Sequence, residues 1–355
     1  MSVSNSLSQK ENLLKAIRFE KPDYIPMTFH INEACFHSYQ PDDLFELMEQ
    51  HPFLFPNFQK SNYIKHSFAK NARRDHPYTD DFGCIWKTTT DGIVGSVHDH
   101  PLSDWENYKT YLFPNPEYST GLESIDWIEF EQNCQIRHDA GEIVYGSLRH
   151  GHTFLQLCDL RGYENLLFDM MDEEPLLSDL ISKLETFNLS QISHFLKANV
   201  DIIRIPEDLG MQRGPMLSVD NFLKYIYPAY QHLITASKQG GKIVHMHSDG
   251  DIRLLANYII DAGVDIFNIQ DLVNGIDWIC ENLKGRVCVD LDIDRQSITP
   301  FGSPAQIHSL IREEVAKIGS KDGGLTMIYG LYPGVPLKNV KAVMDAMEQY
   351  AFYYN

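Results

Sequence analysis

The stretch KIVHMHSDGDI, residues 242–252, joins an apolar run to a polar cluster. The first half has the composition of a buried strand, and the second half, which contains Gly250, has that of a tight turn. Alternate residues of a strand share a face, so we expect His245, His247 and Asp249 to point the same way. A strand that ends in imidazoles and carboxylates predicts a metal site, an acid–base site or only a cap for the next helix.

Short apolar runs like this one recur along the chain. They are YIPMTF (24–29), EIVYGSL (142–148), NVDIIRIP (199–206), KIVHMH (242–247), GVDIFNIQ (263–270), RVCVDLDI (286–293) and LTMIYGL (325–331). Segments with helical periodicity lie between most of them, at 175–196, 221–239 and 252–263. Apolar strands that alternate with amphipathic helices indicate a parallel sheet covered by helices. With an eighth strand in the less regular part of the chain, the pattern predicts an α/β protein with a (β/α)₈ TIM barrel, as a single domain over residues 1–355.

The N-terminal part predicts additions to this barrel. Ser8 and Glu11 form a capping box before a helical pattern. Residues 80–102 read as a hairpin, because two β-rich runs flank an Asp-Gly pair. Residues 103–142 are rich in Trp, Tyr, Pro and acids, and we expect a surface excursion with one or two helices.

The net charge and the cysteine spacing exclude some classes of function and indicate the compartment. The formal charge is −19, from 49 acidic and 30 basic residues, which argues against binding to nucleic acid or to an anionic membrane surface. Six scattered cysteines without a Cys-x-x-Cys pair predict no disulfide framework and a cytoplasmic protein. We find no signal peptide and no apolar run long enough to cross a membrane.

Polar side chains gather where the predicted strands end, which is where a TIM barrel places its active site. They include Glu207, Asp208, His245, His247, Asp249, Asp290 and Tyr329. Structural alternatives stay open at each position. Asp249 could cap the next helix, His245 could be a hydrogen-bonded core residue, and Tyr329 could serve packing. Glu207 and Asp208 could bind backbone amides in the turn.

Several longer stretches resemble the uroporphyrinogen decarboxylase (URO-D) superfamily. These are RFEKPDYIPM (18–27), PEDLGMQRGPMLSVDNFLKYIYPAYQHLI (206–234), GGKIVHMHSDGDI (240–252), GVDIFNIQD (263–271) and YGLYPGVPLKNVKAVMDAM (329–347). The resemblance implies a (β/α)₈ barrel. It also implies one of two activities: cofactor-free decarboxylation of uroporphyrinogen, or methyl transfer in corrinoid systems with the help of a bound zinc.

Two departures favour the methyltransferase branch, and within it the members that demethylate O-methyl or N-methyl compounds. Decarboxylases of the family carry arginines after the first strand, but MTFHINEACFHSY (27–39) has none to receive a polycarboxylate. Thiol-activating methyltransferases carry His-x-Cys where this chain has His247-Ser248-Asp249. The resemblance therefore implies zinc on His247, Asp249 and Glu207, with Asp208 or Asp290 as alternatives to Glu207.

The resulting hypothesis is a methyltransferase that moves a methyl group from a small methylated compound to a corrinoid protein. Asp208, His245, Asp290 and Tyr329 are its candidate catalytic residues, and a homodimer is allowed. A decarboxylase is the alternative, with Arg149, Arg161, Arg204 and Arg213 as the cations that would support it. A non-catalytic binding protein on the same barrel is the second alternative.

Overall fold

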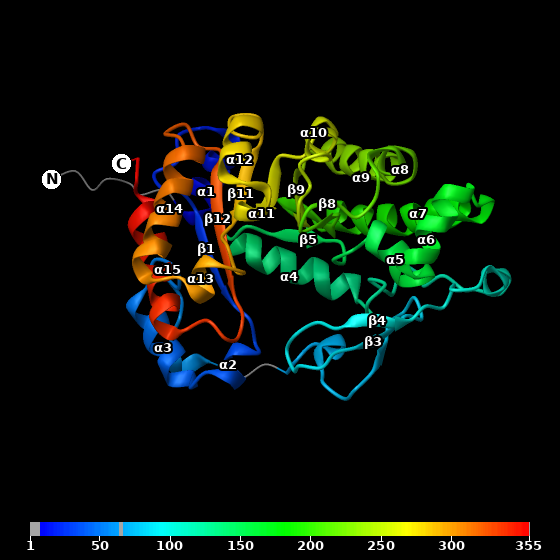
Figure 1. Ribbon diagram of the computed structural model, residues 1–355, viewed down its shortest axis with the longest axis horizontal. Coiled ribbons are helices and arrows are strands. Elements are labelled where there is room, and N and C mark those ends of the chain that lie inside the picture. The colour runs from blue at the N-terminus through cyan, green and yellow to red at the C-terminus, as the bar shows by residue number, and fades with distance from the viewer. Residues whose placement is uncertain (1–7, 64–66, 355) are drawn as a thin grey trace. The chain divides into compact units, whose positions relative to one another are not determined.

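All seven predicted strands are present among residues 8–63 and 67–354, the part of the chain that the computed structural model describes (Figure 1). They alternate with helices, and four of the neighbouring pairs are parallel. This pattern confirms the α/β, TIM-barrel fold class. The expected eighth strand has no counterpart in the barrel sheet formed by the described residues, where seven strands are found.

The described residues divide into two units. The first unit comprises the chain up to residue 69, residues 90–93 and the chain from 268 onward. The second unit comprises residues 70–89 and 94–267. The strand β10 (Ile266–Gln270) contains the point where the chain passes from the second unit into the first.

In the first unit the strands follow the order β1-β12-β11-β10. The remaining elements of this unit are its other three strands and the helices that accompany them. They are α1 (Gln9–Arg18), β1 (Met27–Ile31), α2 (Cys35–Ser38), α3 (Pro41–Gln50), α11 (Asp271–Asn274), α12 (Ile276–Asn282), β11 (Cys288–Asp292), α13 (Ile298–Phe301), α14 (Pro304–Ile318), β12 (Leu325–Leu331) and α15 (Leu337–Ala351). Figure 1 shows α14 and α15 in orange and red, and the two helices pack against each other.

Helix α1 and helix α15 show why these segments are helical. The side chain of Ser8 accepts from the amide of Glu11 and the Glu11 carboxylate accepts from the amide of Ser8, so the expected capping box begins α1. In α15, the buried residues Val340, Val343 and Met347 recur at helical spacing and form the core-facing stripe.

In the second unit the barrel strands follow the order β9-β6-β5. Its elements are β2 (Tyr78–Thr79), β3 (Ile85–Lys87), β4 (Ser96–Asp99), α4 (Trp127–Asp139), β5 (Tyr145–Ser147), α5 (Phe154–Arg161), α6 (Tyr163–Asp172), α7 (Pro175–Lys197), β6 (Ile202–Asp208), β7 (Gly210–Met211), β8 (Gly214–Pro215), α8 (Val219–Asn221), α9 (Tyr227–Gln239), β9 (Ile243–Asp249) and α10 (Ala256–Asp261). Helices α7 and α9 pack against each other beside this sheet.

The hairpin and the excursion are also found. Strands β3 and β4 pair antiparallel, with β2 as the third strand of a small sheet. The segment 103–142 contains the helix α4 and a short 3₁₀ helix, Trp105–Lys109, as expected for one or two helices. No helix within 8–63 or 67–354 combines the length and the hydropathy that crossing a membrane requires.

Candidate metal centre

The C-terminal ends of β6 and β9 carry most of the predicted site residues. The two strands are parallel, and their register pairs Pro206 with His247 and Asp208 with Asp249. In β9 the side chains of His245, His247 and Asp249 are half-buried, whereas the residues between them are fully buried. The three polar residues therefore share one face, as the alternation predicts.

Three side chains in the second unit meet at this edge of the sheet. The Nε2 atoms of His150 and His247 lie 3.3 and 3.4 Å from Oδ1 of Asp208. The two imidazole rings are 5.6 Å apart between centroids. Within the described parts of the chain, this is a group of three potential ligands in which all donor atoms lie within 4.8 Å of one another. The side chains are 51%, 27% and 18% exposed for His150, Asp208 and His247, so the group is reached from solvent on the side of His150.

The two histidines determine the charge state of Asp208. Burial disfavours the carboxylate, but hydrogen bonds and charge from His150 and His247 outweigh this effect. Together they hold the pKa of Asp208 well below its usual range. A carboxylate that stays ionised is a ready ligand for a cation.

The group fits a zinc ion. Zinc bonds of about 2.0–2.1 Å in a tetrahedral arrangement place neighbouring donors about 3.4 Å apart. The two separations from Asp208 Oδ1, 3.3 and 3.4 Å, match this value, and the third, between the two imidazole donors, is within 4.8 Å. Two imidazoles and one carboxylate leave a fourth position open, which is the pattern of catalytic zinc sites.

His150 reaches the group from the loop that follows β5. The amide of Leu148 donates to the carbonyl of Arg204 and the amide of Gly151 to that of Pro206, both at 3.0 Å. These two bonds hold the loop alongside β6, so that His150 lies beside the strand that carries Asp208. His150 is not among the predicted site residues, although EIVYGSL is predicted as a strand and RHGH follows it directly. A TIM barrel places its active site at the C-terminal ends of its strands, and the same reasoning applied to the strand at 142–148 identifies His150.

Asp249 lies next to the group, with Oδ1 3.7 Å from Nε2 of His247 and its amide 3.1 Å from Oδ1 of Asp208. It is not the cap of the next helix, because α10 begins at Ala256 and has no side-chain cap. His245 lies on the same face as His247, two residues earlier in β9. Its catalytic role stays a prediction.

Glu207 points away from this face. It is fully buried, and its two carboxylate oxygens accept from the amides of Thr153, Phe154 and Leu155 at 3.0, 2.8 and 3.2 Å. The hydroxyl of Tyr230 donates to it at 3.0 Å. Glu207 thus takes the amide-binding alternative and holds the start of α5. Burial raises its pKa to about 7, against the lowering effect of these hydrogen bonds.

Asp290 and Tyr329 have their described contacts within the first unit. Asp290 accepts from the Thr326 hydroxyl at 2.6 Å and from the Asn268 amide group at 3.0 Å. Tyr329 is fully buried and donates to the Thr299 hydroxyl at 3.1 Å. Burial raises its pKa to about 12. Their catalytic roles remain predictions, and the contacts of Tyr329 are those of a packing residue.

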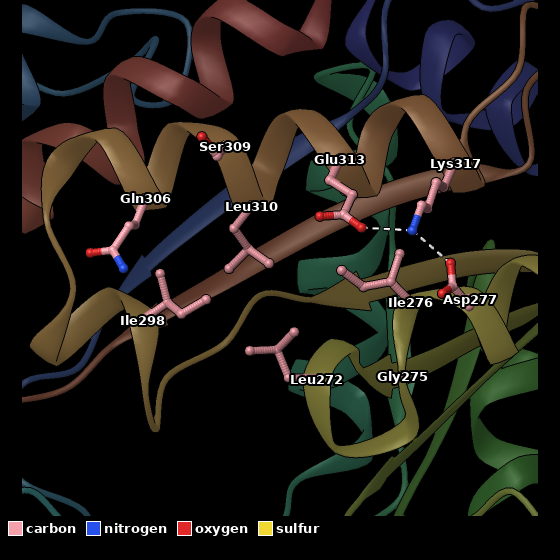
Figure 2. A pocket seen from close by; sticks show the side chains of 10 residues that line it. All are labelled: Leu272, Gly275, Ile276, Asp277, Ile298, Gln306, Ser309, Leu310, Glu313 and Lys317. Atoms are coloured by element: carbon pink, nitrogen blue, oxygen red, sulfur yellow. Dashed lines mark hydrogen bonds and ion pairs between the residues drawn. The ribbon is translucent and has the colours of Figure 1, made fainter.

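The first unit contains a separate pocket of about 480 Å³ (Figure 2). Figure 2 shows Leu272, Ile276, Ile298 and Leu310 lining it from four helices. At one end Lys317 is paired with Asp277 and Glu313, each at 2.6 Å. Its lining contains none of the predicted site residues, so we place the candidate chemistry at the His150–Asp208–His247 group and not here.

Comparison with known proteins shows the fold and the family of the chain. A protein from Christiangramia forsetii described as uroporphyrinogen decarboxylase is 20% identical over 268 residues, which cover 72% of this chain and 73% of the relative. A solved structure of a methyltransferase from Methanosarcina mazei superposes with a TM-score of 0.65 at 18% identity, and covers 97% of this chain and 99% of the other. At this identity the likeness shows the fold. The family model for uroporphyrinogen decarboxylase (URO-D) matches residues 151–350, which include Asp208, His247 and Asp249. By this match, the chain belongs to the URO-D family.

Proposed function

We propose that this protein is a metal-dependent methyltransferase of the URO-D family, which moves a methyl group from a small O- or N-methylated compound to a corrinoid protein. The observation that carries the proposal is the group His150, Asp208 and His247, with its donor atoms within 4.8 Å of one another at the ends of the barrel strands. A polyanion-binding decarboxylase has no need of such a group.

Each residue of the group has a definite task in this proposal. His150, Asp208 and His247 would hold zinc as a nitrogen- and oxygen-rich set that replaces the thiolates of other family members. The bound ion would supply Lewis-acid activation of the leaving oxygen or nitrogen of the donor. Asp208 stays ionised through its contacts with the two histidines. Asp249 lies beside the group, with its Oδ1 3.7 Å from Nε2 of His247.

The methyl acceptor belongs to the partner. The cobalt chemistry would be that of the corrinoid, and this chain would bind the donor and present its methyl carbon. We propose the cytoplasm as the compartment, because the six cysteines are free in the structure.

The contacts of the candidate arginines argue against the decarboxylase alternative, although the match to the relative described as uroporphyrinogen decarboxylase covers 72% of this chain. Arg149 and Arg161 are buried and paired with acids, at 3.1 Å to Asp159 and 2.7 Å to Asp169. Arg204 stacks on the Tyr145 ring at 3.8 Å. Three of the four candidate arginines therefore already have partners, which makes them poor receptors for a polycarboxylate.

The test is the metal content of the purified protein and of protein reconstituted with zinc. We expect about one zinc per chain in the wild type, and its loss in His247→Ala and in Asp208→Asn. His232→Ala is the matched control, because His232 is an exposed histidine of the same unit that pairs with Glu185 at 2.8 Å. A wild type that binds no zinc after reconstitution would overturn the metal-dependent proposal. Zinc-dependent demethylation of any methylated donor with a corrinoid acceptor would exclude a non-catalytic binding protein.

A further inference from the structure

Arg149 is a buried cation directly before His150 in the sequence, and its contacts converge from three parts of the second unit. Its side chain is 5% exposed. One Nη atom lies 3.1 Å from Oδ2 of Asp159 and the other 3.5 Å from Oδ2 of Asp80. Nη1 also donates to the side-chain oxygen of Gln156, and Nε lies 3.4 Å from the carbonyl of His150.

The partners of Arg149 are themselves fixed. Asp80 follows β2 and is fully buried as a side chain, and it accepts from the amide of Cys84 and from Nε1 of Trp86, both at 2.9 Å. Asp159 lies on α5, and its carbonyl accepts from Nδ1 of His100 at 2.8 Å. A planar guanidinium with five donors can meet all of these acceptors at once, which an ammonium cannot do.

The buried charges hold Arg149 in this arrangement. One cation faces two buried carboxylates, and burial raises the pKa of Asp159 to about 6 despite the guanidinium. A buried carboxylate without a cation is costly, so the acids bind Arg149 in place. The next residue along the chain is His150, whose position is therefore tied to the clamp.

We infer that Arg149, clamped between Asp80 and Asp159, is a positioning residue that places the His150 imidazole beside Asp208. The inference rests on the proposed function, in which His150 is a metal ligand. By this inference Asp80, in the hairpin segment, helps to hold Arg149. Asp80 lies outside residues 151–350, the part of the chain that matches the family model. Residues that orient a ligand typically contribute about 10–100-fold to metal affinity.

The chain provides a matched control in Arg161. This arginine is also buried on α5, donates to both oxygens of Asp169 at 2.7 and 3.1 Å and stacks on Trp105 at 4.0 Å. Arg149→Lys and Arg161→Lys both keep the buried charge and lose the fork of donors. Only the first change touches the loop that carries His150.

The first readout is amide hydrogen exchange in the metal-free protein, followed by mass spectrometry on peptides that cover residues 148–155. We expect exchange in this loop to be about tenfold faster in Arg149→Lys and within about twofold of wild type in Arg161→Lys. Equal exchange in the two variants would overturn the inference. If Arg149→Lys does not fold, Asp80→Asn removes one side of the clamp and is expected to have a smaller effect in the same direction.

The second readout is zinc affinity, measured by competition with a chromophoric chelator. We expect Arg149→Lys to bind zinc about 10–100-fold more weakly and Arg161→Lys to stay within about twofold of wild type. Equal weakening in both variants would reduce Arg149 to a structural residue. If the wild type binds no zinc, the proposed function fails, and the exchange experiment still decides whether Arg149 positions the loop.

Discussion

Glu207 and Asp208 are neighbours in the sequence with opposite surroundings. Asp208 faces two histidines, which keep it ionised, whereas Glu207 faces backbone amides and the Tyr230 hydroxyl behind the strand. Alternation along β6 puts them on opposite faces. The sequence could not tell which acid faces the site, because both faces of a parallel sheet are covered and both are rich in apolar residues.

Glu207 predicts a pH-dependent contribution to stability. Its pKa is raised from 4.5 to about 7, so the native state keeps a proton that the unfolded state has lost across this range. The contribution of Glu207 to the free energy of unfolding is therefore full below pH 4.5 and falls as the pH rises towards 7. In Glu207→Gln the side-chain NH₂ group faces the hydrogen-bond donors around this position. We therefore expect the free energy of unfolding to fall by about 1–3 kcal/mol at acidic pH. The difference from wild type should narrow as the pH rises.

Urea unfolding at several pH values between about 5 and 8 measures this difference. Tyr230→Phe is the control, because it removes a single donor to Glu207 and should cost about 0.5–1.5 kcal/mol. A difference between wild type and Glu207→Gln that grows with pH would mean that the hydrogen-bond donors keep Glu207 ionised in the native state.

The elements were more predictable than the site. All seven runs of apolar residues are strands, because near-continuous apolar composition and flanking turn residues are strong local signals. The segment 252–263 forms a helix only at Ala256–Asp261, and Asp251 pairs with Arg253 at 2.8 Å at the point where the helix was expected to begin. His150 follows a predicted strand and could have been found from that position, whereas Asp80 and Arg149 meet through a contact between distant parts of the chain, which no local pattern reports.

Directly beyond the ends of β6 and β9 the backbone of Gly210, in β7, touches that of Gly250. A Cβ atom on Gly250 would lie 2.2 Å from the carbonyl carbon of Gly210, and one on Gly210 would lie 2.5 Å from that of Gly250. Gly250 also has a φ of +82°. The Asp-Gly pair at 249–250 therefore meets two requirements: a left-handed backbone and a contact that leaves no room for a side chain.

Gly250→Ala is expected to lower the free energy of unfolding by about 2–5 kcal/mol, from left-handed strain and from the collision with Gly210. Gly241→Ala separates the two terms, because Gly241 has a φ of +73° with nothing within 4 Å of an added Cβ. We expect this control to cost about 1–2 kcal/mol. Denaturant unfolding of both variants tests the idea, and equal costs would show that the backbone contact adds nothing.

At the scale of the whole molecule, one strand belongs to both units. Residues 266–267 of β10 fall in the second unit and residues 268–270 in the first. Unfolding either unit would disrupt this strand, so we expect the chain to unfold in one cooperative transition, as the single-domain prediction requires.

The tryptophans allow this prediction to be measured. Trp86, Trp105 and Trp127 lie in the second unit, and Trp278 lies in the first. In Trp278→Phe the fluorescence reports the second unit alone, whereas circular dichroism reports both. We expect the two signals to give coincident urea curves, and curves that separate would show that the units unfold independently.

The close contact of Gly210 and Gly250 also has a kinetic consequence. It lies directly beyond the paired strand ends that carry Asp208 and His247, so these two donors cannot move apart without breaking both this contact and the sheet. His150 stands on a loop and is half exposed. In the proposed metal site His150 is therefore the donor that detaches first, and the opening rate of its loop determines the residence time of the ion and the speed at which a chelator removes it.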